Sequence, residues 1–245
     1  VGKGCQALAD IVEQKALENK FPLILGGDHS IGIGSLAGIL RARPNTGVLW
    51  IDAHADLNTP LTSETGNMHG MPLGLLVEGV FEDHASIPGC EWLAFNNNDN
   101  GDVPRLSPDS LVYIGLRDVD VAERKAIREL GILAFTMFDI DKYGIGEVMQ
   151  MALDHLLQNQ PNRPIHLSYD IDAIDPALAP ATGTSVHGGL NFREAHYVVE
   201  AAVKTGLLAS ADLVEVNPTL AEGRDANETT LLGLHIVESI LGKSI

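Results

Sequence analysis

The stretch LWIDAHADLNTP, from Leu49 to Pro60, joins an apolar run to a group of charged side chains. The run from Val48 to Ile51 is typical of a strand in the interior of a sheet. Asp52, His54 and Asp56 then follow at alternate positions. In an extended strand the outer two carboxylates would lie about 13 Å apart. We therefore expect the strand to end near Asp52 and the chain to curl, so that the three side chains come together.

Apolar strand-like runs alternate with helical patterns along the rest of the chain. This alternation is typical of an α/β fold, in which a mostly parallel sheet is covered by helices on both faces. We predict strands at Phe21–Leu25, Gly47–Ile51, Leu111–Leu116, Ile132–Phe138, Ile165–Tyr169 and Leu213–Val216. We predict helices at Ile31–Ala42, Val121–Leu130, Ile145–Leu157, Phe192–Thr205 and Glu228–Leu241. We expect one domain over residues 1–245, in which the segment Glu82–Ser110, containing NNNDNGD and little periodicity, is a loop or insertion.

The composition limits the possible partners. The chain has 33 acidic and 16 basic residues and a formal net charge of -17. This balance argues against nucleic acid and anionic membranes, because both attract clustered Lys and Arg. A cationic small molecule or bound metal cations would be compatible with it, although an acidic soluble surface accounts for most of the charges. The sequence contains neither an apolar run of membrane-spanning length nor a recognisable signal peptide.

The cysteines and the first residue bear on the location of the protein. Cys5 and Cys90 are isolated and make neither a C-x-x-C motif nor a disulfide framework, which favours a reducing, cytoplasmic setting. The chain opens at Val1 without a methionine and enters a helical pattern at once. An upstream segment, including a targeting segment, is therefore compatible with the sequence.

Polar clusters follow the predicted strands. GGDHS comes after Leu25, DAHAD after Ile51, RDVD after Leu116, DIDAID after Tyr169 and EVNP shortly after Leu213. In an open parallel sheet, ligands bind beyond the carboxyl ends of the strands. We therefore expect these clusters to meet at one edge of the sheet.

The chemistry of these clusters predicts a pair of metal ions. The set comprises four carboxylates and two imidazoles: Asp52, Asp56, Asp170, Asp172, His29 and His54. Four buried carboxylates cannot all ionise unless cations hold them, and two divalent ions would balance their charge. Oxygen and imidazole ligands suit Mn²⁺. Two such ions about 3.5–4 Å apart can share a water, lower its pKa toward about 7 and present hydroxide as a nucleophile, which predicts a dinuclear hydrolase.

Other interpretations of the same residues remain open at this point. A lone D-x-H-x-D pattern is often surface or capping chemistry, and His29 alone fits a hydrogen-bonded histidine near a helix start. A mononuclear calcium or magnesium site is an intermediate case, but hard cations seldom recruit two histidines. Gly32, Gly34 and Ala37 also fit a G-x-G-x-x-A nucleotide motif, with Asp52 as the ribose-binding acid. That alternative leaves His54, Asp170 and the other carboxylates unexplained.

With these motifs in order along nearly the whole chain, the sequence resembles the arginase family of ureohydrolases. The matching segments are GGDHS (26–30), DAHADLNTP (52–60), GNMHG (66–70), GLRDVD (115–120), SYDIDAIDPALAPATGT (168–184) and EVNP (215–218). The resemblance implies a three-layer α-β-α fold with two Mn²⁺ ions per chain. It also implies hydrolysis of L-arginine to L-ornithine and urea, by attack of a metal-bridging hydroxide on the guanidinium carbon.

The resemblance also implies roles for individual residues. One Mn²⁺ would be held by His29, Asp52, Asp56 and Asp170, and the other by Asp52, His54, Asp170 and Asp172. The catalytic residues would be His69 as a proton shuttle, Asp56 as a proton acceptor and Glu215 beside the guanidinium. The substrate α-carboxylate would be received by Asn58, Thr65 and Asn67, the α-amino group by Asp120 and Glu123, and Thr184 would line the pocket.

The family comparison leaves some features open. Thr65 stands where the family commonly has serine, which keeps the hydroxyl and adds a methyl next to the substrate. The family carries another strand and helix before the region where this chain begins and a longer tail beyond Ile245, and we expect this chain to lack both. A cytoplasmic homo-oligomer, trimer or hexamer, working in arginine metabolism such as the urea cycle, is implied. A sister ureohydrolase acting on agmatine, guanidinobutyrate or formiminoglutamate, and a non-enzymatic paralogue, are the alternatives.

Overall fold

The fold is built on one sheet of six strands, all parallel, in the order β1-β6-β5-β2-β3-β4. A computed structural model describes residues 1–94 and 104–244, so the predicted NNNDNGD loop lies outside the described residues. The strands are β1 (Leu23–Leu25), β2 (Gly47–Ile51), β3 (Leu111–Leu116), β4 (Leu133–Thr136), β5 (Ile165–Asp170) and β6 (Leu208–Val214). The predicted α/β class with a mostly parallel sheet is confirmed.

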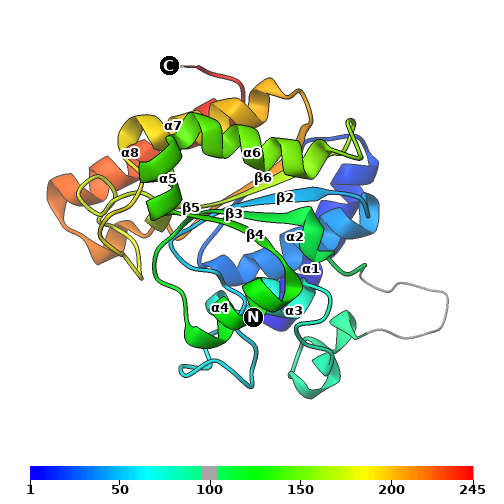
Figure 1. Cartoon of the computed structure of the whole chain (residues 1–245). Helices are drawn as coiled ribbons and strands as arrows, with labels where there is room; N and C mark the ends of the chain where they lie inside the picture. Colours follow the sequence, from blue (N-terminus) through cyan, green and yellow to red (C-terminus); the bar gives the residue numbers. More distant parts are fainter. Residues whose placement is uncertain (95–103, 245) are drawn as a thin grey trace.

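Helices cover both faces of the sheet and give the predicted three layers (Figure 1). One layer contains α1 (Gly2–Leu17), α2 (Gly32–Ala42), α3 (Pro72–Leu76) and α4 (Val121–Leu130). The other contains α5 (Met137–Tyr143), α6 (Ile145–Leu157), α7 (Phe192–Lys204) and α8 (Gly223–Ile240). Short 3₁₀ helices lie at η1 (His29–Ile31), η2 (Met68–Gly70), η3 (His84–Ser86), η4 (Glu91–Leu93), η5 (Pro108–Ser110), η6 (Ile171–Ala173) and η7 (Pro218–Leu220).

The alternation of side chains along the central strands explains the two cores. In β2, Val48 and Trp50 pack in the core under α1 to α3, whereas Leu49 and Ile51 pack in the core under α6 to α8. Every residue of β2 is buried. A strand covered on both faces must be apolar on both, and this is why the run reads as continuous rather than alternating.

Most predicted elements agree with the structure. The bounds of β2, β3, α4 and α6 were predicted without error, and those of α2, β5 and α7 differ by one residue at one end. The predicted strand Phe21–Leu25 is shorter, because only Leu23–Leu25 pairs with β6. The closing helix begins at Gly223, ahead of the predicted Glu228.

Two predictions were wrong. The strand predicted at Ile132–Phe138 ends at Thr136, and α5 begins at once, because the Asp139 carboxylate accepts hydrogen bonds from the Thr136 amide (2.8 Å) and hydroxyl (2.6 Å). Such a capped turn starts a helix. The strand predicted at Leu213–Val216 is β6, which lies at Leu208–Val214 and contains buried polar residues that disguised it.

The glycines that suggested a nucleotide motif have a packing role instead. They lie inside α2, which packs closely against α1. A Cβ atom on Gly34 would lie 2.5 Å from the Cys5 carbonyl oxygen. Gly38, a further glycine of α2 outside that motif, would in the same way place a Cβ atom 2.5 Å from the Ala9 carbonyl oxygen. Glycine is required here so that the two helix backbones can approach one another.

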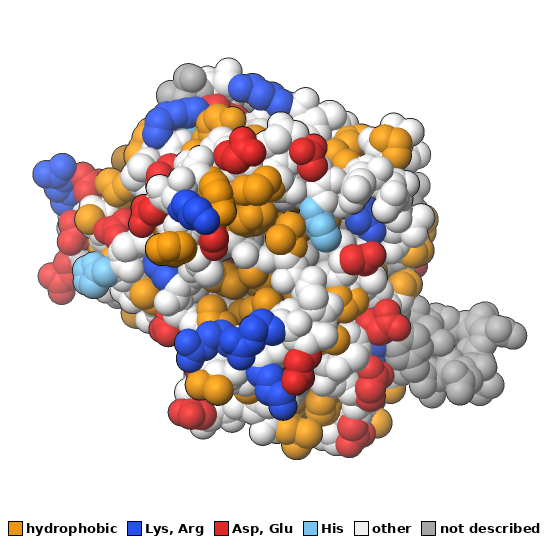
Figure 2. Space-filling model, viewed as in Figure 1, with side chains coloured by type: hydrophobic (Ala, Val, Ile, Leu, Met, Phe, Trp, Pro, Cys, Tyr) orange, Lys and Arg blue, Asp and Glu red, His pale blue; other side chains and the backbone are white. Residues whose placement is uncertain are grey.

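The surface shown in Figure 2 has the same viewpoint as Figure 1, with the edge strand β4 toward the reader. Hydrophobic side chains gather across the middle of this face, and both acidic and basic side chains surround them (Figure 2). The excess of acidic residues is therefore not a continuous acidic patch on this side. None of the helices in the described part of the chain is long and apolar enough to cross a membrane.

Candidate metal and substrate site

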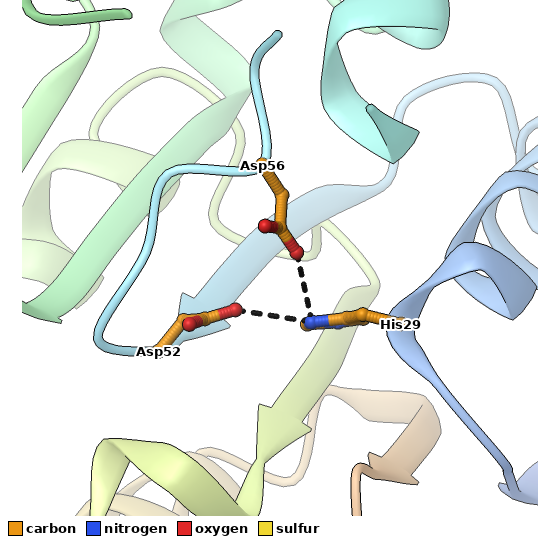
Figure 3. A group of neighbouring side chains, drawn as sticks. All are labelled: His29, Asp52 and Asp56. Atoms are coloured by element: carbon orange, nitrogen blue, oxygen red, sulfur yellow. Dashed lines mark ion pairs between the residues drawn. The ribbon is translucent and has the colours of Figure 1, made fainter. Parts of the chain in front are cut away.

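The charged side chains predicted to meet do so at the carboxyl ends of the strands. His29 begins η1, which follows β1 by three residues, and Asp52 comes directly after β2. Asp170 is the last residue of β5, and Asp172 lies in η6 immediately beyond it. All four side chains are buried. In Figure 3 the carboxylates of Asp52 and Asp56 point from the end of β2 and the following loop toward the His29 ring.

The predicted curl after β2 is present. Asp56 has a positive φ of 50°, which turns its side chain back toward Asp52. Its carbonyl oxygen accepts hydrogen bonds from the amides of Leu73 (3.0 Å) and Gly74 (3.3 Å) at the start of α3. These contacts fix the turn, so Asp52 and Asp56 converge where an extended strand would have separated them.

His29 lies at the centre of a first group of histidine and carboxylate side chains. Its Nδ1 atom is 3.0 Å from a carboxylate oxygen of Asp52, 3.0 Å from one of Asp56 and 3.2 Å from one of Asp170. The other ring nitrogen, Nε2, is 2.8 Å from the Ser168 hydroxyl, and the ring stacks on Trp50 at 4.1 Å. Nδ1 is buried and has no hydrogen-bond partner of acceptable geometry. One ring nitrogen can donate at most one proton, so it cannot satisfy three carboxylates.

His54 lies at the centre of a second group. Its Nδ1 atom is 3.1 Å from Asp172 and 3.4 Å from Asp52. The two sets with metal-ligand spacing, His29–Asp52–Asp56 and Asp52–His54–Asp172, share Asp52. The His54 side chain is 23% exposed, whereas His29 is 1% exposed, so the second group faces the solvent more than the first.

The carboxylates perturb one another strongly. Burial, followed by the charges of Asp172 and Asp52, raises the pKa of Asp170 well above its ordinary value. Burial and the charge of Asp52 raise the pKa of Asp56 to about 7. Burial lowers the pKa of His54, but hydrogen bonds to Asp172 and Asp52 outweigh it and raise that pKa to about 12. Without an added cation this cluster therefore retains protons near neutral pH.

These observations fit a pair of divalent cations. The donors are carboxylate oxygens and imidazole nitrogens, the unpartnered Nδ1 of His29 points to where three carboxylate oxygens converge, and Asp52 belongs to both groups. A cation at each group would replace the retained protons and would give the unpartnered Nδ1 atom a partner. The structure thus brings all six predicted metal-ligating residues together.

Four members of the two groups, His29, His54, Asp56 and Asp170, line a pocket of about 260 Å³. All of the residues predicted for catalysis and substrate binding line it: Asp56, Asn58, Thr65, Asn67, His69, Asp120, Glu123, Thr184 and Glu215. Ser63, Glu64 and Asp118 also line it and were not predicted, although Asp118 lies in the RDVD segment and the other two lie between the DAHADLNTP and GNMHG segments. The described lining residues include several carboxylates and no Lys or Arg, so the pocket favours a cationic ligand.

The loops around the pocket are tied to one another. The Asn58 side-chain amide donates to the Asp120 carboxylate (2.8 Å). The two oxygens of Glu123 accept hydrogen bonds from the backbone amides of Leu57 (2.9 Å) and Asp120 (2.9 Å). The Thr184 hydroxyl donates to Asp172 at 3.0 Å. Glu123 therefore holds the two walls of the pocket together in addition to contributing a negative charge.

Glu215 connects the pocket to the first histidine–carboxylate group. One of its carboxylate oxygens accepts a hydrogen bond from the His29 backbone amide at 2.8 Å, and burial raises its pKa. Glu215 has a positive φ of 64°. In the described part of the chain only Asn19, Asp56 and Glu215 show this conformation outside glycine, and two of the three lie in the site. Strained backbone of this kind is often found at functional sites.

The model of the arginase family matches residues 2–242. Arginase-1 of Sus scrofa is 48% identical over 230 residues, which cover 94% of this chain and 68% of that protein. The arginase of Coccidioides posadasii is 48% identical over 250 residues, which cover all of this chain and 74% of that protein.

Solved structures give the same result. The arginase of Bacillus caldovelox superposes with a TM-score of 0.85 at 38% identity, over all of this chain and 76% of that one. The formimidoylglutamase of Bacillus subtilis also superposes, with a TM-score of 0.76, but at 23% identity this likeness shows only a shared fold.

Proposed function

The chain belongs to the arginase family of hydrolases, and on this basis we propose that it hydrolyses L-arginine to L-ornithine and urea with two bound Mn²⁺ ions. The observation that carries the proposal is the pair of histidine–carboxylate groups at the floor of an acid-lined pocket. The donor set of oxygen and imidazole nitrogen, without sulfur, favours manganese over a thiolate-bound metal. We assign the six ligands as above, with Asp52 and Asp170 shared by both ions.

The two ions, when bound, would supply Lewis acidity that activates water as a nucleophile near neutral pH and stabilises the negative charge that develops at the attacked carbon. Glu215 orients the planar, cationic guanidinium through charge-assisted hydrogen bonds, because its carboxylate faces the pocket beside His29. Asp56 accepts the proton that the attacking group releases. The leaving alkylamine must gain a proton, and His69 at the pocket wall supplies it as a general acid.

Another set of pocket-lining residues would recognise the amino-acid end of the substrate. Asn58, Thr65 and Asn67 offer uncharged hydrogen-bonding groups, which suit a carboxylate. Asp120 and Glu123 offer negative charges, which suit an ammonium group. Thr184 holds Asp172 through its hydroxyl and lines the pocket beside the ligands. A pocket with both kinds of group is matched to an α-amino acid that also carries a guanidinium.

Substrate competition tests this proposal. Agmatine lacks the carboxylate and guanidinobutyrate lacks the amine, so each leaves polar groups of the pocket without a partner. A site built for hydrogen bonds can reject such analogues by up to about 10⁴–10⁵-fold. We expect kcat/KM for urea release to be higher with L-arginine than with agmatine or guanidinobutyrate. We also expect it to be higher than kcat/KM for formamide release from formiminoglutamate. Asp120→Ala should raise KM for arginine and so lower the ratio of kcat/KM for arginine to kcat/KM for guanidinobutyrate.

Equal or faster urea release from agmatine would contradict the arginine assignment and favour a sister ureohydrolase. We further propose that the protein acts as a cytoplasmic homo-oligomer, a trimer or a hexamer, in arginine breakdown and urea production. The mass of the native particle, measured by light scattering, would test the oligomeric state.

A further inference from the structure

A file of polar side chains runs through the interior of the sheet directly beneath the site. Strands β5 and β6 place His166 opposite Ser210 and Ser168 opposite Asp212, and Asp170 follows at the end of β5. Ser35 reaches the same place from α2. His166, Ser168, Ser210, Asp212 and Ser35 are all completely buried. Burying a histidine and a carboxylate costs free energy that apolar side chains of similar size would not.

The contacts in this file converge on one oxygen atom. Oδ2 of Asp212 lies 2.7 Å from the Ser35 hydroxyl, 3.2 Å from His166 Nε2 and 3.5 Å from the Ser168 hydroxyl. The other oxygen, Oδ1, is buried and has no hydrogen-bond partner in the described structure. The carboxylate is therefore not arranged for the best pairing of its own two oxygens. The hydrogen bonds to this carboxylate from Ser35, His166 and Ser168 all end on Oδ2.

The direction of the hydrogen bonds follows from the chemistry of a carboxylate, which only accepts. Ser168 has a single hydroxyl proton, and Asp212 is the acceptor for it. The Ser168 oxygen must then accept from Nε2 of His29, at 2.8 Å. A proton on Nε2 leaves Nδ1 as the nitrogen that gives up its proton, and Nδ1 is the atom surrounded by Asp52, Asp56 and Asp170.

From this geometry we infer that Asp212 is a positioning residue, which acts through Ser168 to present Nδ1 of His29 to a metal ion. Without Asp212 the Ser168 hydroxyl is free to rotate and to donate to Nε2, and a neutral His29 would then carry its proton on Nδ1, where the ion must bind. His166, held by Ser210 at 2.8 Å, keeps Asp212 in place. The inference rests on the proposed function, because it requires His29 to be a ligand.

The experiment measures Mn²⁺ affinity and stoichiometry of purified variants by competition with a chelator. Partners that orient a metal-binding histidine typically contribute about 10–100-fold to affinity. Asp212→Asn and Ser168→Ala are each expected to weaken one of the two Mn²⁺ equivalents by this amount and to leave the equivalent at His54 nearly unchanged. Since both act on one path, the double variant should be no weaker than the more affected single variant. Ser168→Ala removes only a hydroxyl, so this variant can test the inference if the Asp212→Asn protein does not fold.

Ser35→Ala is the matched control. It removes the shortest hydrogen bond to Asp212 but lies off the path to His29, so it should lower the melting temperature of the metal-free protein without changing Mn²⁺ affinity. An equal loss of affinity in Ser35→Ala, or a uniform weakening of both equivalents in Asp212→Asn, would mean that the file is merely structural. Unchanged affinity in both path variants would overturn the inference alone, whereas a wild type that binds no Mn²⁺ would overturn the proposed function as well.

Discussion

The buried charged groups at the two ends of the central sheet differ in their partners. At the amino end, Arg163 donates to the carbonyl oxygens of Asn45 (2.8 Å) and Leu156 (3.1 Å) and to the Ser110 hydroxyl (2.6 Å). These partners lie just before β2, at the end of α6 and just before β3, so one guanidinium joins three segments. At the carboxyl end, four buried carboxylates face two imidazoles and one another.

The difference separates structural charge from functional charge. The donors of Arg163 point at neutral acceptors that the chain itself supplies, so the group needs nothing from outside. The carboxylates of Asp52, Asp56 and Asp170 converge on a single ring nitrogen, which cannot satisfy them. A buried charge whose neighbours are mostly of like sign indicates an external ion.

Removal of a shared carboxylate should have the largest effect. Asp170→Asn takes away a charge that we assign to both ions, so both should be lost or weakened. We expect the variant to lose about 4 kcal/mol of transition-state stabilisation, which corresponds to a decrease of about 10³-fold in kcat/KM. Elemental analysis of the loaded protein and urea assays measure the two effects. Full activity in this variant, or a loaded wild type without metal, would refute the dinuclear model.

Replacement of His69 should be the next largest change and should leave the ions in place. The imidazole lines the pocket but belongs to neither histidine–carboxylate group. His69→Asn is therefore expected to lower kcat by about 10²-fold or more, as for a lost general acid, with two Mn²⁺ still bound. Metal loss equal to that of Asp170→Asn would instead make His69 a ligand.

At the amino end the same kind of change should affect stability alone. Arg163→Met leaves the buried Leu156 carbonyl group, the Asn45 carbonyl group and the Ser110 hydroxyl without their donor, and we expect the free energy of unfolding to fall by about 2 kcal/mol. Mn²⁺ content and kcat of the folded protein should match the wild type. Denaturant titration and metal analysis together decide the matter, and a loss of Mn²⁺ would show that the two ends are coupled.

The pH dependence of stability should reveal the unbalanced end directly. Folding raises the pKa of Asp56 from 3.8 to about 7, so the folded protein holds a proton that the unfolded chain has released. The free energy of unfolding of the metal-free protein should therefore fall as pH rises through this range, by about 1.4 kcal/mol per pH unit for one full proton. The raised pKa of His54 acts in the same direction above pH 6.5. Denaturant titrations in chelator measure this slope, and Mn²⁺ should abolish it; a flat profile without metal would contradict the proposed charge balance.

Much of the fold and site could be predicted because local chemistry and tertiary structure agree there. The continuous apolar run of β2 and the helical spacing of α6 each indicate a single element. The convergence of the six histidine and aspartate side chains was predictable because parallel strands deliver the residues that follow them to one edge. The curl at Asp56 was predictable from the impossibility of a compact site on an extended strand.

The errors occurred where a local pattern had two interpretations. Ser210 and Asp212 made β6 look like a loop, since only the neighbouring Ser168 and His166 on β5 explain why polar residues are buried there. The turn from β4 into α5 had a visible signal in the spacing of Thr136 and Asp139, but the apolar Met137 and Phe138 favoured continuing the strand. Pairing between strands that are distant in the sequence cannot be predicted from a short window of it.

The acid-lined mouth of the pocket also affects how molecules arrive and leave. A chain of net charge -17 whose described pocket residues include no Lys or Arg draws cations inward over several ångströms, so capture of arginine should be fast at low ionic strength and slower as salt screens the field. The two products then part unequally. Urea carries no charge and feels none of this attraction, whereas ornithine keeps its ammonium groups and is held back. The acidic pocket that speeds the entry of arginine therefore makes ornithine leave more slowly than urea. Release of ornithine then helps to limit the turnover rate.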